Sequence, residues 1–497
     1  MRNLFYVATI VAAVACVGPP AYQPPSVRVA PSYASVVPQV APRGGDSSRT
    51  RPPTSEPPAA AALDASAPSA RYSPEPADAP FWRELNDPAL TRLIDEALRA
   101  STDVDAAEAR LTSARASRRV SAFDLGPTVT AVGSATRQRA SIVSVPGLTS
   151  QLPQRDLYDV GFDASWELDV FGRVSRTVNA YGTLASSAEH GLRDVQVSLA
   201  AEVARTYFDL RGAERQLEVA RRNAENQRRT VALTQDRLAA GRGTAFDTER
   251  ARAVLQLTLS AVPVIETRIA ADRNRIATLV GRAPGTLPPE WLAGGALPTL
   301  PGVVRIGSPE QLVRRRPDVL SAERQLAAQS LFVGAARAEY LPRLTFGASA
   351  GYAATAFDSL SRRGTSRLVA GPVVTWPLLD LGRVKARVDV AHARADEARA
   401  QYSATVLRAM EETETALATY DRAHARLALL NDAVQASERA SALAQQRFEA
   451  GLTDFLQVLD SQRTLLDAEN QLARAHTTAA TALVAVYKAV GGTWPIR

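Results

Sequence analysis

Apolar and polar residues alternate strictly along residues 158–168, where the even positions are apolar or aromatic. The odd positions carry Asp159, Asp163 and Glu167 among small residues. A period of two with aromatic residues on the apolar side is typical of a β-strand that faces lipid on one side and water on the other. A soluble antiparallel sheet with one buried face would show the same alternation. Weaker or shorter versions of the pattern predict three further strands, at 128–138, 344–352 and 367–378.

A helical pattern fills most of the remaining chain in unusually long segments. Residues 383–450 contain no Gly and no Pro and are rich in good helix formers. As one helix this segment would be roughly 100 Å long at 1.5 Å per residue. The corresponding segment 173–240 contains three glycines and is expected to bend, and 242–280 is expected to kink at Pro263. Shorter helices are expected to flank the long ones, at 103–123, 318–340 and 452–490.

The two long segments belong to two copies of one module. Three landmarks recur 210 positions later: Gly172-Arg173-Val174 as Gly382-Arg383-Val384, Arg237 with Gly241 as Arg447 with Gly451, and Gly281 as Gly491. A constant offset over three landmarks indicates an internal duplication with no insertion between them. Each copy therefore holds a pair of strands, one very long helix and shorter helices that flank it.

Four strands raise the problem of closure. An open sheet edge within lipid leaves backbone N–H and C=O groups unpaired. The smallest membrane barrels use about eight strands. If these strands span a membrane, the chain must therefore assemble into an oligomer, in which two copies would supply eight strands and three copies twelve.

Composition and motifs give no support to nucleic-acid binding, metal binding or catalysis. The formal net charge is +7, but nearly all basic residues are Arg, interspersed with Asp and Glu as in residues 387–399, which is typical of solvated helix faces. The four histidines stand singly and have no metal-ligand spacing. No Walker loop and no G-x-G-x-x-G motif is present. We therefore expect no nucleic-acid partner, no metal, no cofactor and no enzyme activity.

The N-terminus has the form of a secretory signal. Arg2 precedes an apolar run that ends at Ala15, and the only cysteine, Cys16, follows it. The run is too short to be a spanning helix. The sequence before Cys16 resembles a bacterial lipobox, in which the cysteine is lipidated, although Ala13 stands where Leu is usual. The alternative is an ordinary signal cut near Ala15, with Cys16 incidental. Residues 16–79 are rich in Pro, Ala and Ser and are expected to form an extended tether.

Several segments together resemble the TolC-like outer-membrane efflux proteins, in particular the lipoprotein branch that serves drug-efflux pumps. The match runs from about Pro80 to Gly492. The segments that carry it are 82–88 (WRELNDP), 166–173 (WELDVFGR), 315–319 (RRPDV), 379–383 (LDLGR), 447–454 (RFEAGLTD) and 458–463 (VLDSQR). The chain departs from the family pattern in its long tether and at residues 101–103, where the family usually has Asn.

The resemblance implies a mainly α chain with a membrane β-barrel. Four strands from each subunit of a homotrimer would form a twelve-stranded barrel in the outer-membrane lipid, continued by a long α-helical barrel through the periplasm. The partners it implies are a periplasmic adaptor (membrane fusion) protein and an inner-membrane pump of the RND type. The corresponding divisions are a signal peptide (1–15), a lipid-anchored tether (16–79), a first repeat (80–281), an inter-repeat linker that forms an equatorial belt with the termini (282–316) and a second repeat (317–497).

The functional residues of such a duct would form a gate rather than a catalytic site. Gly241 and Gly451 lie where each long helix reverses and would form the periplasmic tip. Leu456 and Asp460 are four residues apart and share a helix face, and the resemblance implies that they close the lumen as an apolar ring and a carboxylate ring. An exposed helical acid is the alternative for Asp460. Arg447 and Arg463 match arginines near the gate and would hold the helices shut through ion pairs. The barrel lumen would be lined by Asp159, Asp163 and Glu167, as a solvated wall.

Three functions fit the sequence. The first is a passive, gated exit duct of a tripartite pump that exports drugs or other small toxic compounds from a Gram-negative bacterium. The second is the exit duct of a type I protein-secretion system. The third is a lipid-anchored coiled-coil scaffold without a pore. The resemblance favours the first function. The exported substrate is not encoded in this chain, because the inner-membrane pump selects it.

Overall fold

The computed structural model describes residues 32–36, 70–75, 80–139, 153–293 and 297–492. The chain divides into two compact units, and each takes pieces from both repeats. We call them the strand unit (described residues within 108–190 and 320–404) and the hairpin unit (described residues within 27–107, 191–319 and 405–497). The expected signal peptide and Cys16 lie outside the described residues.

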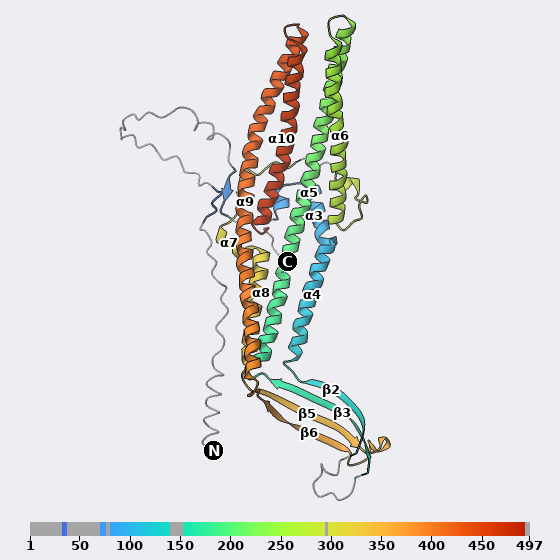
Figure 1. Cartoon of the computed structure of the whole chain (residues 1–497), viewed down its shortest axis with the longest axis vertical. Helices are drawn as coiled ribbons and strands as arrows, with labels where there is room; N and C mark the ends of the chain where they lie inside the picture. Colours follow the sequence, from blue (N-terminus) through green and yellow to red (C-terminus); the bar gives the residue numbers. More distant parts are fainter. Residues whose placement is uncertain (1–31, 37–69, 76–79, 140–152, 294–296, 493–497) are drawn as a thin grey trace, which may run out of the picture. The chain divides into compact units, whose positions relative to one another are not determined.

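The strand unit contains one antiparallel sheet of four strands in the order β2-β3-β5-β6 (Figure 1). The strands are β2 (Thr128–Gln138), β3 (Arg155–Leu168), β5 (Arg343–Ala354) and β6 (Ser366–Thr375). The four strands predicted from alternation are confirmed, with ends displaced by a few residues. The repeats meet at the centre, where β3 pairs with β5 over eleven positions from Tyr158↔Ala354 to Leu168↔Leu344. β2 and β6 are the two edges, and β6 carries Pro372, a residue that sheets tolerate at edges.

The two faces of this sheet differ in chemistry as the alternation predicts. Pairing of Phe162 with Ala350 and of Trp166 with Phe346 puts the even positions of β3 and β5 on one face. The large apolar side chains of that face are exposed, among them Val129, Val160, Phe162, Phe346, Leu368 and Val374. A soluble sheet would bury such a face, so the exposed apolar surface favours contact with lipid.

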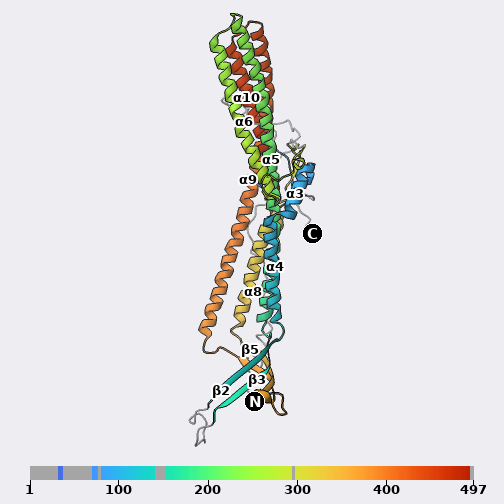
Figure 2. The ribbon, with the colours of Figure 1, turned by 90° about the vertical axis from the view of Figure 1, so that its right-hand side faces the viewer.

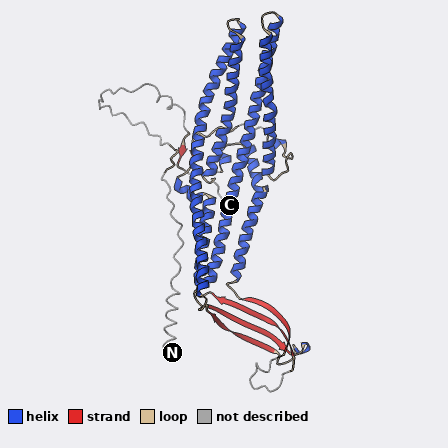
Figure 3. Cartoon of the chain, viewed as in Figure 1, coloured by secondary structure: helices blue, strands red, loops and turns tan. Residues whose placement is uncertain are grey.

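The four main helices follow the duplication closely. They are α5 (Arg173–Ala239), α6 (Ala245–Leu279), α9 (Leu381–Glu449) and α10 (Phe455–Ala489), drawn in blue in Figure 3. Both ends of α6 recur 210 positions later as the ends of α10, and the end of α5 recurs as the end of α9. α5 is one continuous helix through its three glycines, and α6 continues through Pro263.

Shorter helices complete the described chain (Figure 2). They are α2 (Phe81–Glu84), α3 (Pro88–Ala100), α4 (Thr102–Phe123), α7 (Pro309–Arg315) and α8 (Pro317–Ala338), with 3₁₀ turns at Pro289–Trp291 and Phe357–Ser359. Their starts follow capping rules. The Asp87 carboxylate accepts hydrogen bonds from two backbone N–H groups at the start of α3, and Ser308 with Gln311 forms a capping box at α7.

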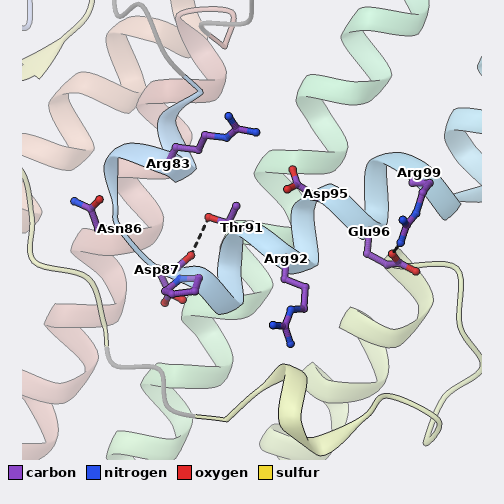
Figure 4. Close-up of a pocket in the computed structure, with 9 residues that line it drawn as sticks. Arg83, Asn86, Asp87, Thr91, Arg92, Asp95, Glu96 and Arg99 are labelled. Atoms are coloured by element: carbon purple, nitrogen blue, oxygen red, sulfur yellow. Dashed lines mark hydrogen bonds and ion pairs between the residues drawn. The ribbon is translucent and has the colours of Figure 1, made fainter.

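The corner before α3 fixes the N-terminal part of the hairpin unit. Phe81 and Trp82 are buried, and the Phe81 ring stacks on Tyr487 of α10 with 5.1 Å between ring centroids. The Tyr207 hydroxyl of α5 donates to the Asp87 carboxylate over 2.7 Å. Figure 4 shows a nearby pocket whose lining is mostly charged. In it the Thr91 hydroxyl donates to the backbone carbonyl of Asp87, and Glu96 forms an ion pair with Arg99. The residues before α3 thus hold the start of this helix against α5 and α10.

Two short pieces of the Pro-rich segment that is predicted to be a tether contact the hairpin unit. The backbone N–H groups of Ala34 and Ser35 donate to the Glu414 carboxylate over 2.8 and 2.9 Å, and Tyr33 beside them is buried. Further along, β1 (Tyr72–Ser73) pairs in parallel with β4 (Val304–Arg305). The tether predicted over residues 16–79 is therefore docked at these two points.

Candidate functional site

The hairpin tips are built alike in both repeats. Gly241 and Gly451 adopt left-handed backbone with φ of 67° and 72°, a conformation that glycine reaches without strain. At each tip the N–H of the residue after the glycine bonds back over 2.8 Å, to the carbonyl oxygen of Arg237 in one and of Arg447 in the other. The reversals predicted at these glycines are present, and their role as the periplasmic tip remains a prediction.

The first turns of α10 have one buried face and one exposed face. Phe455, Val458 and Leu459 are buried in a cluster to which α5, α6 and α9 also contribute. Leu456 and Asp460 lie on the other face and are exposed. The structure therefore leaves both predicted gate residues available to an aqueous space or to another subunit.

The predicted arginines make no ion pair with Asp460 within the described chain. Arg447 lies in the last turn of α9 and Arg463 in the third turn of α10, and both are exposed. The salt bridges of the described residues, with N···O within 4.0 Å, include none from Arg447 or Arg463 to Asp460. Ion pairing at the gate, as predicted from the resemblance, would have to join different subunits.

Arg237 is a residue at this tip that the sequence interpretation missed. Its guanidinium lies 3.9 Å from the centroid of the Phe448 ring and donates to the Phe448 carbonyl over 3.2 Å. This cation–π contact joins α5 to α9. The duplication could have drawn attention to Arg237, because it is the counterpart of Arg447, just as Leu238 is the counterpart of Phe448.

A polar contact also crosses between the two helical hairpins. Glu469 of α10 has a side chain only 10% exposed. Its carboxylate accepts from the Arg222 guanidinium over 2.6 Å and from the Asn223 amide over 2.9 Å, both on α5. A buried carboxylate needs such partners, because its desolvation is not otherwise compensated. Nearer the tip, the Gln462 amide donates to the Thr230 hydroxyl over 3.4 Å.

The three acids predicted to line the barrel lumen lie on the polar face of the sheet. Asp159 forms a bidentate ion pair with Arg367 of β6, at 2.6 and 2.7 Å. Asp163 accepts from the Ser349 hydroxyl over 2.6 Å. Glu167 pairs with Arg173 at 2.6 and 2.8 Å. The acids are thus paired with neighbours, as suits a structural wall, and their position in a lumen remains a prediction.

The expectation that the chain lacks a G-x-S-x-G motif is wrong, because residues 347–351 spell this pattern. In α/β-hydrolases this pattern presents a nucleophilic serine at a sharp strand-to-helix turn. Here all five residues lie inside β5, and the Ser349 hydroxyl bonds Asp163 on the neighbouring strand. The letters therefore reflect alternation of small residues in a strand and supply no nucleophile.

A buried arginine organises the junction between the repeats. Arg316 donates to both Asp318 oxygens at 3.0 and 2.7 Å, to Glu412 at 2.7 Å and to the Ala489 carbonyl at 3.0 Å. Burial, with the nearby Asp318 carboxylate, raises the pKa of Asp194 above its ordinary value, and Arg316 opposes the shift. Residues 315–319, which carry part of the resemblance, therefore connect α8, α9 and α10 through the hydrogen bonds of Arg316.

Metal-binding geometry is missing from the described part of the chain. No group of three or more His, Cys, Asp or Glu side chains there could hold a metal ion. Among the described helices, α6 is long and apolar enough to cross a membrane by length and composition. Length and composition alone are weak evidence, and the sheet is the better candidate for lipid contact.

Comparison with known proteins agrees with this geometry. Residues 93–282 and 308–492 match the family described as outer membrane efflux protein. The chain belongs to that family. It is an outer-membrane efflux channel, and the matched segments include both tips and all four main helices.

Relatives and solved structures of similar proteins cover most of this efflux channel. It is 31% identical over 414 residues to the toluene efflux pump outer membrane protein TtgI of Pseudomonas putida, covering 83% of this chain and 87% of the relative. It is 31% identical over 447 residues to the outer membrane protein OprJ of Pseudomonas aeruginosa, covering 89% and 92%. The structure of the outer-membrane channel OprN superposes with a TM-score of 0.80 at 36% identity, covering 89% and 99%. The structure of the outer membrane protein VceC from Vibrio cholerae superposes with a TM-score of 0.75 at 26% identity, covering 84% of this chain and 99% of VceC.

Proposed function

We propose that this chain is the passive exit duct of a tripartite efflux system and works as a homotrimer. The observation that carries the proposal is the open four-stranded sheet with an exposed apolar face and two edge strands. Lipid cannot satisfy the backbone groups of β2 and β6, so each β6 edge would pair with the β2 edge of the next subunit. Three copies give twelve strands, within the range of outer-membrane barrels.

The hairpin unit would form the periplasmic part of the duct, with the gate at its tips. Leu456 and Asp460 would form an apolar ring and a carboxylate ring, and Arg447 and Arg463 would pair across subunits at the closed tip. Asp159, Asp163 and Glu167 would line the barrel. The channel binds no cofactor and has no catalytic role in this proposal, since its residues form a wall and a gate.

A periplasmic adaptor and an inner-membrane pump of the RND type are the partners that fit this function. Relatives of similar identity are named for different cargo: TtgI for toluene at 31% identity, and OpmQ of Pseudomonas aeruginosa for pyoverdine export at 29%. Because similar ducts serve different compounds, we infer that the pump selects the substrate. Drugs or other small toxic compounds are the substrate class proposed here.

The trimer is tested by mass and by conductance. In mild detergent the purified protein should contain three chains, which is three times 53.1 kDa or about 159 kDa of polypeptide less the three copies of residues 1–15 that processing removes, measured by light scattering with the detergent subtracted. In planar bilayers it should form discrete ion-conducting channels. A stable, folded monomer would contradict the architecture, and a trimer without conductance would support the pore-less scaffold instead.

The competing transport class is distinguished in cells. Deleting the gene in the source bacterium should increase its susceptibility to small toxic compounds and leave its secreted proteins unchanged. Loss of one secreted protein, with unchanged susceptibility, would identify a type I secretion duct. An unmarked copy of the gene should restore the parental phenotype.

Lipidation of Cys16 is a separate prediction from the lipobox. Mass spectrometry of the mature N-terminus should find a diacylglyceryl-modified Cys16, with residues 1–15 removed. The Cys16→Ser variant should still assemble into trimers, because a spanning barrel does not depend on a lipid anchor. An unmodified N-terminus that begins at another residue would contradict the prediction.

A further inference from the structure

We propose that one end of the sheet binds the phosphate groups of a glycolipid in the outer leaflet of the outer membrane. We call it the loop end, and it contains the C-termini of β2 and β5 and the N-termini of β3 and β6. The site would combine Arg137 and Arg139 of one subunit with Arg362 and Arg363 of the next. This inference rests on the proposed function, in which the loop end faces the outside of the cell.

The apolar face of the sheet is bounded by aromatic residues. Along β3 this face runs through alternate positions from Tyr158 to Leu168. That length is roughly 34 Å at about 3.4 Å per residue, or about 25 Å along the membrane normal for a strand tilted by about 45°. Tyr352 of β5, near Tyr158, is 52% exposed, and Trp166 lies near the other boundary. Because the apolar band of a membrane barrel has this height and such aromatic girdles, residues beyond Tyr158 would lie at the level of the lipid head groups.

An arginine on this same face lies just beyond the aromatic boundary. Arg137 of β2 is directly opposite Asp156 of β3. The next pair on that face is Ala135 with Tyr158, so Arg137 faces the apolar side. Its guanidinium donates to both Asp156 oxygens, over 2.5 and 2.7 Å, and the side chain remains 66% exposed. A charged pair within the hydrocarbon would be unfavourable, so this position suits the head-group region.

The arginines of β2 retain unused hydrogen-bond donors. A guanidinium carries five N–H donors. Within the described chain, Asp156 accepts from two of those on Arg137, and Gln154 accepts from one on Arg139, over 3.2 Å. Both arginines are exposed. Their remaining donors can therefore bind phosphate oxygens in the bidentate manner typical of arginine.

The loop between β5 and β6 carries two more arginines. The Phe357 ring contacts the Tyr158 ring, with 5.9 Å between centroids, which holds the start of the loop against the apolar face. Arg362 pairs with Asp358 at 3.7 Å, and Arg363 has no ion pair with another described residue. Both arginines are exposed, so the loop adds accessible cations to the loop end.

The proposed trimer would bring these two sets of arginines together. In that assembly each β2 edge pairs with the β6 edge of the next subunit, a contact that we call the β2–β6 seam. The end of β2, with Arg137 and Arg139, then meets the start of β6, which follows Arg362 and Arg363. Four arginines and the two aspartates paired with them give each seam a net charge of +2. A head group with two phosphates complements that charge.

The two ends of the sheet have opposite charge. Six arginines and three aspartates give the loop end a net charge of +3, counted over residues 134–139, 154–159 and 355–367. Three arginines and five acids give the end that joins the helices a net charge of −2, counted over residues 124–128, 167–173, 339–345 and 375–383. The outer leaflet of a Gram-negative outer membrane is rich in glycolipid with phosphorylated head groups. The charge of the sheet therefore favours phosphate at the end that faces this leaflet in the proposed topology.

Two double variants with the same loss of charge test the site. Arg139→Gln with Arg363→Gln removes two arginines that have no ion pair with a described residue, so the fold should be retained. Arg155→Gln with Arg119→Gln is the control, because Arg155 lies at the loop end on the polar face and Arg119 lies on α4. Bis-phosphorylated lipid A is titrated onto the purified trimer, and bound lipid is counted by native mass spectrometry. Lipid A without its phosphates and phosphatidylglycerol are the comparison probes.

The binding data decide the outcome. Lipid A should bind the parent trimer with one molecule at each β2–β6 seam, and the site variant should bind it about tenfold more weakly. The control should change binding by less than about twofold. Removing the phosphates should weaken binding to the parent as much as the site variant does, and phosphatidylglycerol should bind more weakly than lipid A. Equal binding by the two double variants, or of lipid A with and without phosphates, would overturn the proposal. A preference for phosphatidylglycerol would overturn the assignment to a glycolipid.

The orientation of the sheet is tested separately in intact cells. An Arg363→Cys variant should react with a membrane-impermeant maleimide, because the loop end faces the medium in the proposed topology. The parent chain controls for its native Cys16. Reaction only after lysis would contradict the proposed function. Labelling of intact cells, together with equal lipid A binding by the two double variants, would overturn the lipid site alone.

Discussion

Replacing Asp460 and Arg447 together with alanine should increase the resting conductance of the channel about tenfold. Both side chains are exposed in the single chain, so each inter-subunit pair at the closed tip is expected to contribute about 0.5 kcal/mol. Three copies per pore would then stabilise the closed tip by about 1.5 kcal/mol, close to the 1.4 kcal/mol that corresponds to tenfold. Planar-bilayer recording of the purified trimer measures this change directly.

The first hairpin supplies the control for this gate variant. Arg242→Ala with Glu249→Ala removes one arginine and one acid near the other tip and should leave the conductance unchanged. Cells with the gate variant should also admit large antibiotics that the outer membrane normally excludes. If the trimer is intact and the conductance equals that of the parent, Asp460 and Arg447 are ordinary helix surface and the gate lies elsewhere.

Arg316→Ala should have the largest effect on stability. The Arg316 side chain is 9% exposed and bonds Asp318, Glu412 and the end of α10. Removing the Arg316 side chain leaves these acceptors without their shared donor. We expect the free energy of unfolding to fall by about 2–3 kcal/mol. This is less than for a fully buried ion pair, because Glu412 is half exposed. The thermal midpoint of trimer dissociation, followed by circular dichroism and denaturing gels, should fall by several degrees.

The pH dependence of that loss follows from the raised pKa of Asp194. An acid whose pKa is raised by folding binds its proton more readily in the folded chain, so its unfavourable contribution is relieved as the pH falls. Arg316 opposes the rise, so the variant should raise the pKa of Asp194 further. The stability lost in Arg316→Ala should therefore be greatest at neutral pH and should shrink as the pH falls toward 3.8, the ordinary pKa of Asp.

Two variants make the Arg316 result specific. Arg316→Lys keeps the charge but loses the planar fork that reaches three acceptors, and should lie between the parent and the alanine variant. Arg314→Ala removes a neighbouring arginine whose pair with Glu310 is largely exposed and should change the midpoint little. Equal thermal midpoints for Arg316→Ala and Arg314→Ala would show that the hydrogen bonds of Arg316 are dispensable for stability.

The strands, the long helices and the reversals could all be predicted from the sequence because each depends on local chemistry. Alternation in 158–168 reports one wet face and one apolar face whatever the strand pairs with. The absence of Gly and Pro from 383–450 permits one long helix. Gly241 and Gly451 occupy turns with positive φ, which glycine adopts most easily.

The roles of repeated residues were decided only by the tertiary structure. Arg237 and Arg447 stand at equivalent positions, yet Arg237 lies over Phe448 in its own chain while Arg447 is exposed. Nothing in the sequence distinguishes Glu469 from the other acids of the helices, and only the approach of α5 makes it a buried, paired one. Duplicated sequences encode the same local structure twice, but burial and pairing depend on which neighbour each copy meets, and those neighbours are far apart along the chain.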